Sequence, residues 1–258
     1  MDAVLEAVAV RFRYHFEGDR PTNRPERPEW FLSYLLRALD AFQPFLETHV
    51  HPLLVAEEGG PAVTGGVDCV AYFARGVALL ARRRLRALLS AMMRDAALLS
   101  HTAEEALAFD ANLDKIVGYL HLPARFPGVA WPRCMEVLTG RPERLQRWLD
   151  VDHALAQEKL RAALNADGAW ARVLWKVVPA PPLPVTGSAR DFVSLVAALT
   201  RRYRTLGDPG LQLRYAAATQ RPLLRGYLEA IYSRSKACNV RYLFRESAAG
   251  GGGGGGGG

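Results

Sequence analysis

Apolar side chains recur at intervals of three and four residues along most of this 258-residue sequence, beginning near Trp30. That spacing places them on one face of an α-helix, whereas a half-buried strand would show strict alternation. Segments rich in Gly or Pro interrupt the pattern at residues 57–66, 123–132 and 179–184. The sequence therefore predicts an all-α fold made of successive helices separated by loops.

Helix starts are expected where capping residues precede the apolar runs. Thr102 and Glu105 fit a capping box, and Ser188 resembles an N-cap residue. Pro209 suits the first turn of the last long helix, because proline lacks only an N–H that has no partner there. Residues 170–174 continue a helical pattern, so we expect a helix there as well.

The interruptions also predict how the chain is divided. We expect an N-terminal segment (1–29), a helical bundle region (30–178), a Pro-rich linker (179–187), a C-terminal helical region (188–246) and a disordered Gly-rich tail (247–258). The tail is almost entirely glycine, which cannot bury enough apolar surface to offset its ordering entropy.

The least generic stretch is RFRYHF at residues 11–16, followed by TNRPERPEW at residues 22–30. An extended backbone would place Phe12, Tyr14 and Phe16 on one side and the basic residues on the other, so a short extended segment is expected here. The rings form either a buried aromatic strap that holds the first long helix or a basic and aromatic binding surface. The local sequence does not decide between these two interpretations.

The formal charge of +7 is compatible with an anionic partner such as nucleic acid or a lipid surface. However, only four of the 33 basic residues are lysine, and the arginines are spread over many predicted helices. The densest cluster, Arg82, Arg83, Arg84 and Arg86, has no aromatic residue between its members, unlike a platform that stacks bases. A solvated helix surface is the favoured interpretation.

No motif of catalysis or cofactor binding is found. His49 and His51 are two residues apart and would point away from each other on a helix, so they cannot chelate one metal ion. Asp150, Asp152 and His153 are expected to be surface charges. The glycines form no phosphate-binding fingerprint. We therefore predict no enzymatic activity, no cofactor and no metal.

The sequence carries no recognisable targeting or membrane segment. The first ten residues, MDAVLEAVAV, contain two carboxylates in place of a positive region, and no stretch reaches the ~18 apolar residues that a membrane span requires. The three cysteines are widely spaced and fit neither a disulfide framework nor a thiolate metal site. We expect a cytosolic protein in a reducing compartment.

RFRYHF, TN and PEW, in this order, resemble the signature of the RINT/Tip family of vesicle-tethering subunits. QRWL at residues 146–149 continues the resemblance, which covers residues 12–244. The residues that carry it are expected to be structural or partner-binding: Arg11, Phe12, Arg13, Tyr14, His15, Phe16, Thr22, Asn23, Pro28, Glu29, Trp30, Gln146, Arg147, Trp148 and Leu149.

The resemblance implies an elongated rod of consecutive helical bundles that acts as a non-enzymatic scaffold in Golgi-to-ER retrograde vesicle transport. It implies a cytoplasmic protein, peripheral on the ER membrane, whose partners are a Zeste-white-type tethering subunit and ER SNAREs, with no small-molecule ligand. The alternative is a basic helical module that binds nucleic acid or an anionic membrane surface. The family's N-terminal coiled coil has no counterpart here and RESAAGGGG replaces its final helices, so a fragment is expected.

Overall fold

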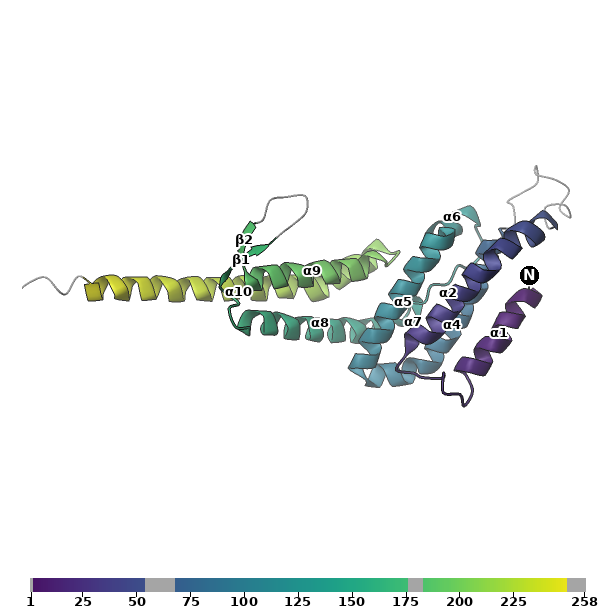
Figure 1. The fold of residues 1–258 in the computed structure, drawn as a ribbon, viewed down its shortest axis with the longest axis horizontal. Coiled ribbons are helices and arrows are strands. Elements are labelled where there is room, and N and C mark those ends of the chain that lie inside the picture. Colours follow the sequence, from purple (N-terminus) through teal and green to yellow (C-terminus); the bar gives the residue numbers. More distant parts are fainter. Residues whose placement is uncertain (1, 54–67, 176–182, 250–258) are drawn as a thin grey trace, which may run out of the picture. The chain divides into compact units, whose positions relative to one another are not determined.

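The computed structural model describes residues 2–53, 68–175 and 183–249, which form α-helices with one small sheet (Figure 1). The all-α prediction is therefore confirmed. The chain divides into two compact units, residues 1–152 with 201–213 and residues 153–200 with 214–258. Each unit is described by itself.

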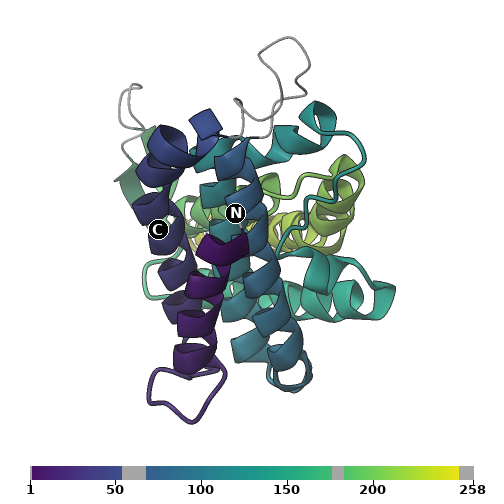
Figure 2. The same ribbon diagram turned by 90° about the vertical axis from the view of Figure 1, so that its right-hand side faces the viewer.

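The first unit is built on long helices that pack side by side (Figures 1 and 2). These are α1 (Asp2–Phe16), α2 (Pro28–Phe45), α4 (Cys69–Arg94) and α5 (Ala96–Val117). α2 contacts both α4 and α5, and α1 lies against α2 and α4.

α2 ends one residue after Pro44, and a π-helix, η1 (Leu46–Val50), continues the chain. Proline at this position removes a backbone donor from the helix ladder.

Aspartates, and not the predicted threonine, cap the two central helices. The Asp68 carboxylate accepts a hydrogen bond from the Ala71 N–H at the start of α4, and Asp95 does the same for two N–H groups of α5. Thr102 lies inside α5 and is fully buried, so the predicted capping box is wrong. α5 begins at Ala96, six residues before the predicted cap, where two alanines carry no amphipathic signal.

A connector of short helices completes this unit: η2 (Tyr119–His121), α6 (Leu122–Arg125) and α7 (Glu136–Thr139). The buried Trp131 ring lies within 6 Å of the rings of Tyr72, Tyr119 and Phe126. The buried Asp110 carboxylate accepts hydrogen bonds from the backbone N–H groups of Cys134 and Met135 at 2.8 and 3.1 Å. These contacts fasten the connector to α4 and α5.

The remaining elements are α8 (Pro142–Asn165), β1 (Arg172–Trp175), β2 (Leu183–Thr186), α9 (Gly187–Arg204) and α10 (Pro209–Ala249). Within the second unit, Phe192 of α9 stacks on Tyr227 of α10 with ring centroids 4.2 Å apart. Leu160 of α8 and Leu223 of α10 are buried there as well.

Two local expectations in this region are wrong. Residues 172–175 form an antiparallel pair with β2, in which Val173 is opposite Val185, and do not continue a helix. Four residues are too few for their spacing to separate helix from strand. The cap of α9 is the Thr186 hydroxyl, which accepts from the Ala189 N–H at 3.2 Å, while Ser188 is buried inside the helix.

Several predicted features lie outside the described residues. These are the Gly and Pro loop at 57–66, most of the proline run at 179–184 and the glycines from residue 250. The predicted domain boundaries and the rod shape remain predictions.

Candidate partner-binding surface

RFRYHF lies at the end of α1 and is helical, not extended as predicted. On a helix, residues four apart share a face, so Phe12 and Phe16 point together into the unit and are 0% and 7% exposed. Tyr14 is 52% exposed on another face. An alternation of only six residues also fits a helix that has one buried stripe, which is why the extended interpretation failed.

The two buried rings belong to an aromatic cluster that joins α1 to α2. Phe12 lies 6.3 Å from Phe31 and 6.2 Å from Tyr34, measured between ring centroids. Phe16 lies 5.5 Å from Tyr34. Such tilted and edge-on pairs add a favourable electrostatic contribution to the burial of apolar surface. The cluster is thus the strap that one of the two sequence interpretations proposed, formed by Phe12 and Phe16 without Tyr14.

The TN pair shapes the loop between α1 and α2. The Thr22 hydroxyl donates to the His15 carbonyl at 2.7 Å, and the Asn23 amide donates to the Gly18 carbonyl at 2.8 Å. Asn23 also accepts a hydrogen bond from the Arg84 guanidinium. These side chains hold backbone groups of the loop that have no helical partner.

Two arginines of the predicted solvated cluster fasten this loop to α4. Arg83 forms a bidentate ion pair with Glu17, with N–O distances of 2.6 and 2.8 Å. Arg84 is 9% exposed and reaches Asn23. The interpretation of the Arg82–Arg86 cluster as a solvated face is therefore wrong for Arg84, whereas Arg83 is exposed to solvent while it pairs with Glu17.

PEW begins α2. Pro28 is buried at the first helical position. Glu29 pairs with His101 of α5 at 3.1 Å and with Arg27 at 3.5 Å. Burial raises the pKa of Glu29, but its own backbone hydrogen bond and the contact with His101 outweigh this and leave the pKa below the usual value. Trp30 is 42% exposed.

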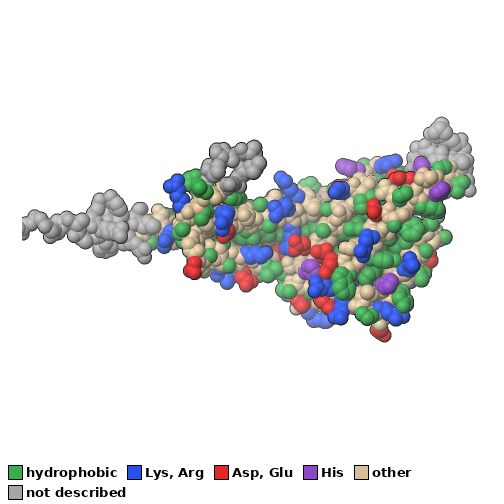
Figure 3. All heavy atoms as spheres, in the orientation of Figure 1, with side chains coloured by type: hydrophobic (Ala, Val, Ile, Leu, Met, Phe, Trp, Pro, Cys, Tyr) green, Lys and Arg blue, Asp and Glu red, His purple; other side chains and the backbone are tan. Residues whose placement is uncertain are grey.

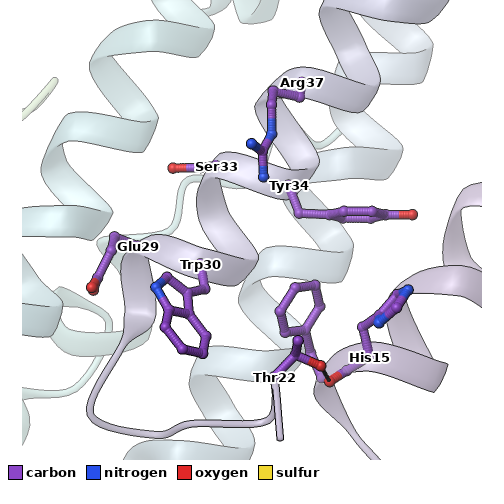
Figure 4. Close-up of a pocket in the computed structure, with 8 residues that line it drawn as sticks. His15, Thr22, Glu29, Trp30, Ser33, Tyr34 and Arg37 are labelled. Carbon is purple, nitrogen blue, oxygen red and sulfur yellow. Dashed lines mark hydrogen bonds between the residues drawn. The ribbon is translucent and has the colours of Figure 1, made fainter. Parts of the chain in front are cut away.

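A hollow of about 420 Å³ opens between the end of α1 and the first turns of α2 (Figure 4). In Figure 4 the rings of Trp30, Tyr34 and His15 lie around it, and Arg37 lies one turn further along α2. Its lining consists of His15, Phe16, Thr22, Glu29, Trp30, Ser33, Tyr34 and Arg37. Five of these eight residues belong to the family motif, so the structure gathers part of the motif around one aromatic hollow, hereafter the aromatic pocket.

Ser33, Tyr34 and Arg37 line the pocket but were not predicted as site residues. The available signal was their spacing of three, four and seven residues from Trp30, which places all four on one face of α2. Burial raises the pKa of Tyr34, while the charge of Arg11 on α1 lowers it.

The second part of the motif, QRWL, does not line the aromatic pocket. Trp148 and Leu149 are buried in α8, with 0% and 3% exposure. Gln146 is exposed and donates to Asp150 at 2.8 Å. Arg147 is partly exposed on the same helix. This part of the motif packs the first unit.

Asp152 was expected on the surface, but it is 1% exposed. Its carboxylate pairs with Arg202 at 2.9 Å and accepts from the Ser100 hydroxyl at 3.3 Å. Arg202 also contacts Glu104 at 3.2 Å. The partner is fifty residues away in sequence, so no local pattern indicated that this carboxylate is buried in an ion pair.

Within the described part of the chain, no group of three His, Cys, Asp or Glu residues is arranged to hold a metal ion. The same part contains no helix that combines the length and the apolar character needed to cross a membrane.

Comparison with known proteins gives a consistent assignment. The model of the RINT-1/TIP-1 family matches residues 1–250. The RINT1-like protein of Drosophila melanogaster is 31% identical over 216 residues, which cover 82% of this chain and 27% of that protein. The chain thus spans about a quarter of that relative's length. No solved structure matches this chain. This chain belongs to the RINT-1/TIP-1 family.

Proposed function

We propose that this chain is a non-enzymatic scaffold region of a vesicle-tethering subunit that acts in Golgi-to-ER retrograde transport. The observation that carries the proposal is the family match over residues 1–250. Its proposed partners are a Zeste-white-type tethering subunit and ER SNAREs, and its proposed place is the cytoplasmic side of the ER membrane.

The aromatic pocket is the proposed contact for a protein partner. Trp30 is a large, half-exposed ring beside a preformed hollow, which is the kind of anchor that dominates many interfaces. The Phe12 and Phe16 cluster fixes one wall, because both rings are buried against α2. Binding of a partner would therefore require little ordering of these side chains, so the free-energy cost of association would be small.

The distribution of charge supports a protein partner over a diffuse electrostatic one. On the face drawn in Figure 3, basic and acidic side chains are interspersed. Arg83 and Arg84 of the densest cluster are engaged with Glu17 and Asn23. Binding of nucleic acid or anionic membrane through the whole surface is accordingly the weaker candidate.

The test is capture from cytosol and from detergent-solubilised ER with the immobilised chain as bait. Mass spectrometry should find tethering subunits and ER SNAREs enriched, and Trp30→Ala should reduce their recovery several-fold. The matched control is Tyr232→Ala, which removes a ring that is 63% exposed elsewhere. Enrichment of neither class, with the bait folded by circular dichroism, contradicts the proposal.

A further inference from the structure

A second hollow, of about 600 Å³, lies between α4, α7 and the start of α8, and arginines dominate its lining. Arg82 and Arg86 come from α4, Arg141 immediately precedes α8, and Arg144 lies in its first turn. One carboxylate, that of Glu136, lines it with them. We call it the arginine pocket; it shares no residue with the aromatic pocket.

Four guanidinium groups are thus balanced by one carboxylate. Arg82 pairs with Glu136 at 2.9 Å, and Arg144 donates to the Val137 carbonyl at 3.2 Å. Arg86 and Arg141 are exposed and form no ion pair with any described residue. The Nε of Arg82 is buried and has no hydrogen-bond partner in the described part of the chain. The pocket therefore contains hydrogen-bond donors without acceptors and more positive than negative charge.

The backbone adds to this charge. α8 runs for 24 residues from Pro142, so the positive end of its dipole lies at the edge of the pocket beside Arg141. Pro142 has no N–H, and the N–H groups of Arg144 and Leu145 already donate to the Arg141 carbonyl, so the helix start contributes its dipole and few free donors. The Glu143 carboxylate in the first turn offsets part of that dipole. The arginine side chains therefore carry the preference for an anion, and the helix dipole adds to it.

The lining also constrains what that ligand is. One guanidinium group can donate two parallel hydrogen bonds to two oxygens of the same phosphate, so arginine is well suited to phosphate recognition. No aromatic ring lines the pocket, so it offers nucleic-acid bases no surface for stacking. A concave site of this size suits a compact anion better than an extended chain.

We propose that the arginine pocket binds a compact anion carrying two or more phosphate groups, such as an inositol polyphosphate, free or as a lipid headgroup. This site is independent of the proposed tethering function and does not rest on it.

The test measures binding of inositol hexakisphosphate by calorimetry and binding to phosphatidylcholine vesicles with or without phosphatidylinositol 4,5-bisphosphate. Arg86→Gln with Arg141→Gln should weaken binding by about tenfold or more, because both groups are free to contact phosphate. The same positions changed to Lys should recover only part of the affinity, since lysine cannot bind phosphate in a bidentate way. The matched control is Arg161→Gln with Arg221→Gln, two exposed arginines that do not line the pocket.

Loss confined to the pocket variant supports the proposal. Binding of the soluble anion then identifies a free ligand, and binding to the phosphoinositide vesicles alone identifies a headgroup. Equal loss in the control variant, or no binding to either probe, overturns it. Tighter binding of a single-stranded oligonucleotide than of inositol hexakisphosphate also overturns it, in favour of nucleic acid. Circular dichroism verifies that every variant is folded.

Discussion

At the scale of single residues, Asp110 is a carboxyl group of α5 that is buried in the first unit, with 2% exposure. Burial raises its pKa from 3.8 to about 6, although the N–H groups of Cys134 and Met135 and the charge of Arg133 oppose the rise. Because the folded pKa lies above the unfolded one, the folded state binds the proton more tightly. This carboxyl therefore favours folding below about pH 4 and loses that contribution as pH rises through about 6.

We expect Asp110→Asn to remove this part of the pH dependence. Relative to the variant, the wild-type protein should lose on the order of 2–3 kcal/mol of unfolding free energy between pH 4 and 7.5. Urea midpoints of both proteins across this range provide the measurement. Asp150→Asn is the control, because Asp150 is exposed on α8. Parallel pH profiles for Asp110→Asn and wild type would contradict the expectation.

Trp148 is the largest fully buried side chain of the family motif. Truncation leaves a cavity that the surrounding helices fill only in part, so Trp148→Ala should cost about 3–5 kcal/mol of unfolding free energy. Denaturant titration followed by circular dichroism measures this. The neighbouring exposed change Gln146→Ala should cost less than about 0.5 kcal/mol. A Trp148→Ala midpoint equal to wild type would make the ring a surface anchor.

At the scale of elements, helices with a sustained apolar spacing were predictable, whereas the backbone form of short stretches was not. α2 and α8 begin at Pro28 and Pro142, and proline favours the first helical turn. Their apolar positions keep helical spacing over many turns. RFRYHF and residues 172–175 are six and four residues long, so their apolar spacing fits a helix and a strand equally well. The aromatic pocket was half predictable: the motif drew attention to Trp30, but nothing local showed that Tyr34 and Arg37 share its hollow.

The helical form of RFRYHF has its own test. A strand would give its three rings equal roles, whereas α1 buries Phe12 fully and leaves Tyr14 half exposed. Phe12→Ala should therefore cost about 3–5 kcal/mol of unfolding free energy. Tyr14→Ala should cost no more than about 1 kcal/mol, because the ring's contact with the Arg20 guanidinium, 4.2 Å away, is at the surface. Similar losses in the two variants would point back to the extended arrangement.

At the scale of the whole molecule, the question is whether net charge or a specific surface governs association. The +7 charge is carried mainly by arginines, and the structure shows that these have different roles. Arg83 holds a loop, Arg202 neutralises a buried carboxylate, and Arg86 lines a pocket. Composition alone could not separate these roles, because each depends on residues distant in sequence.

Capture of protein partners should accordingly follow the aromatic pocket and not the net charge. Trp30→Ala with Tyr34→Ala leaves the charge unchanged and should lower recovery of tethering subunits and SNAREs several-fold at both low and high salt. Arg161→Gln with Arg221→Gln removes two charges and should leave recovery nearly unchanged. Ions screen exposed charges within about 8 Å at physiological ionic strength, so a diffuse electrostatic contact would weaken steeply with salt. If the arginine variant loses its partners and the aromatic variant keeps them, with both folded, association is electrostatic and the scaffold proposal fails.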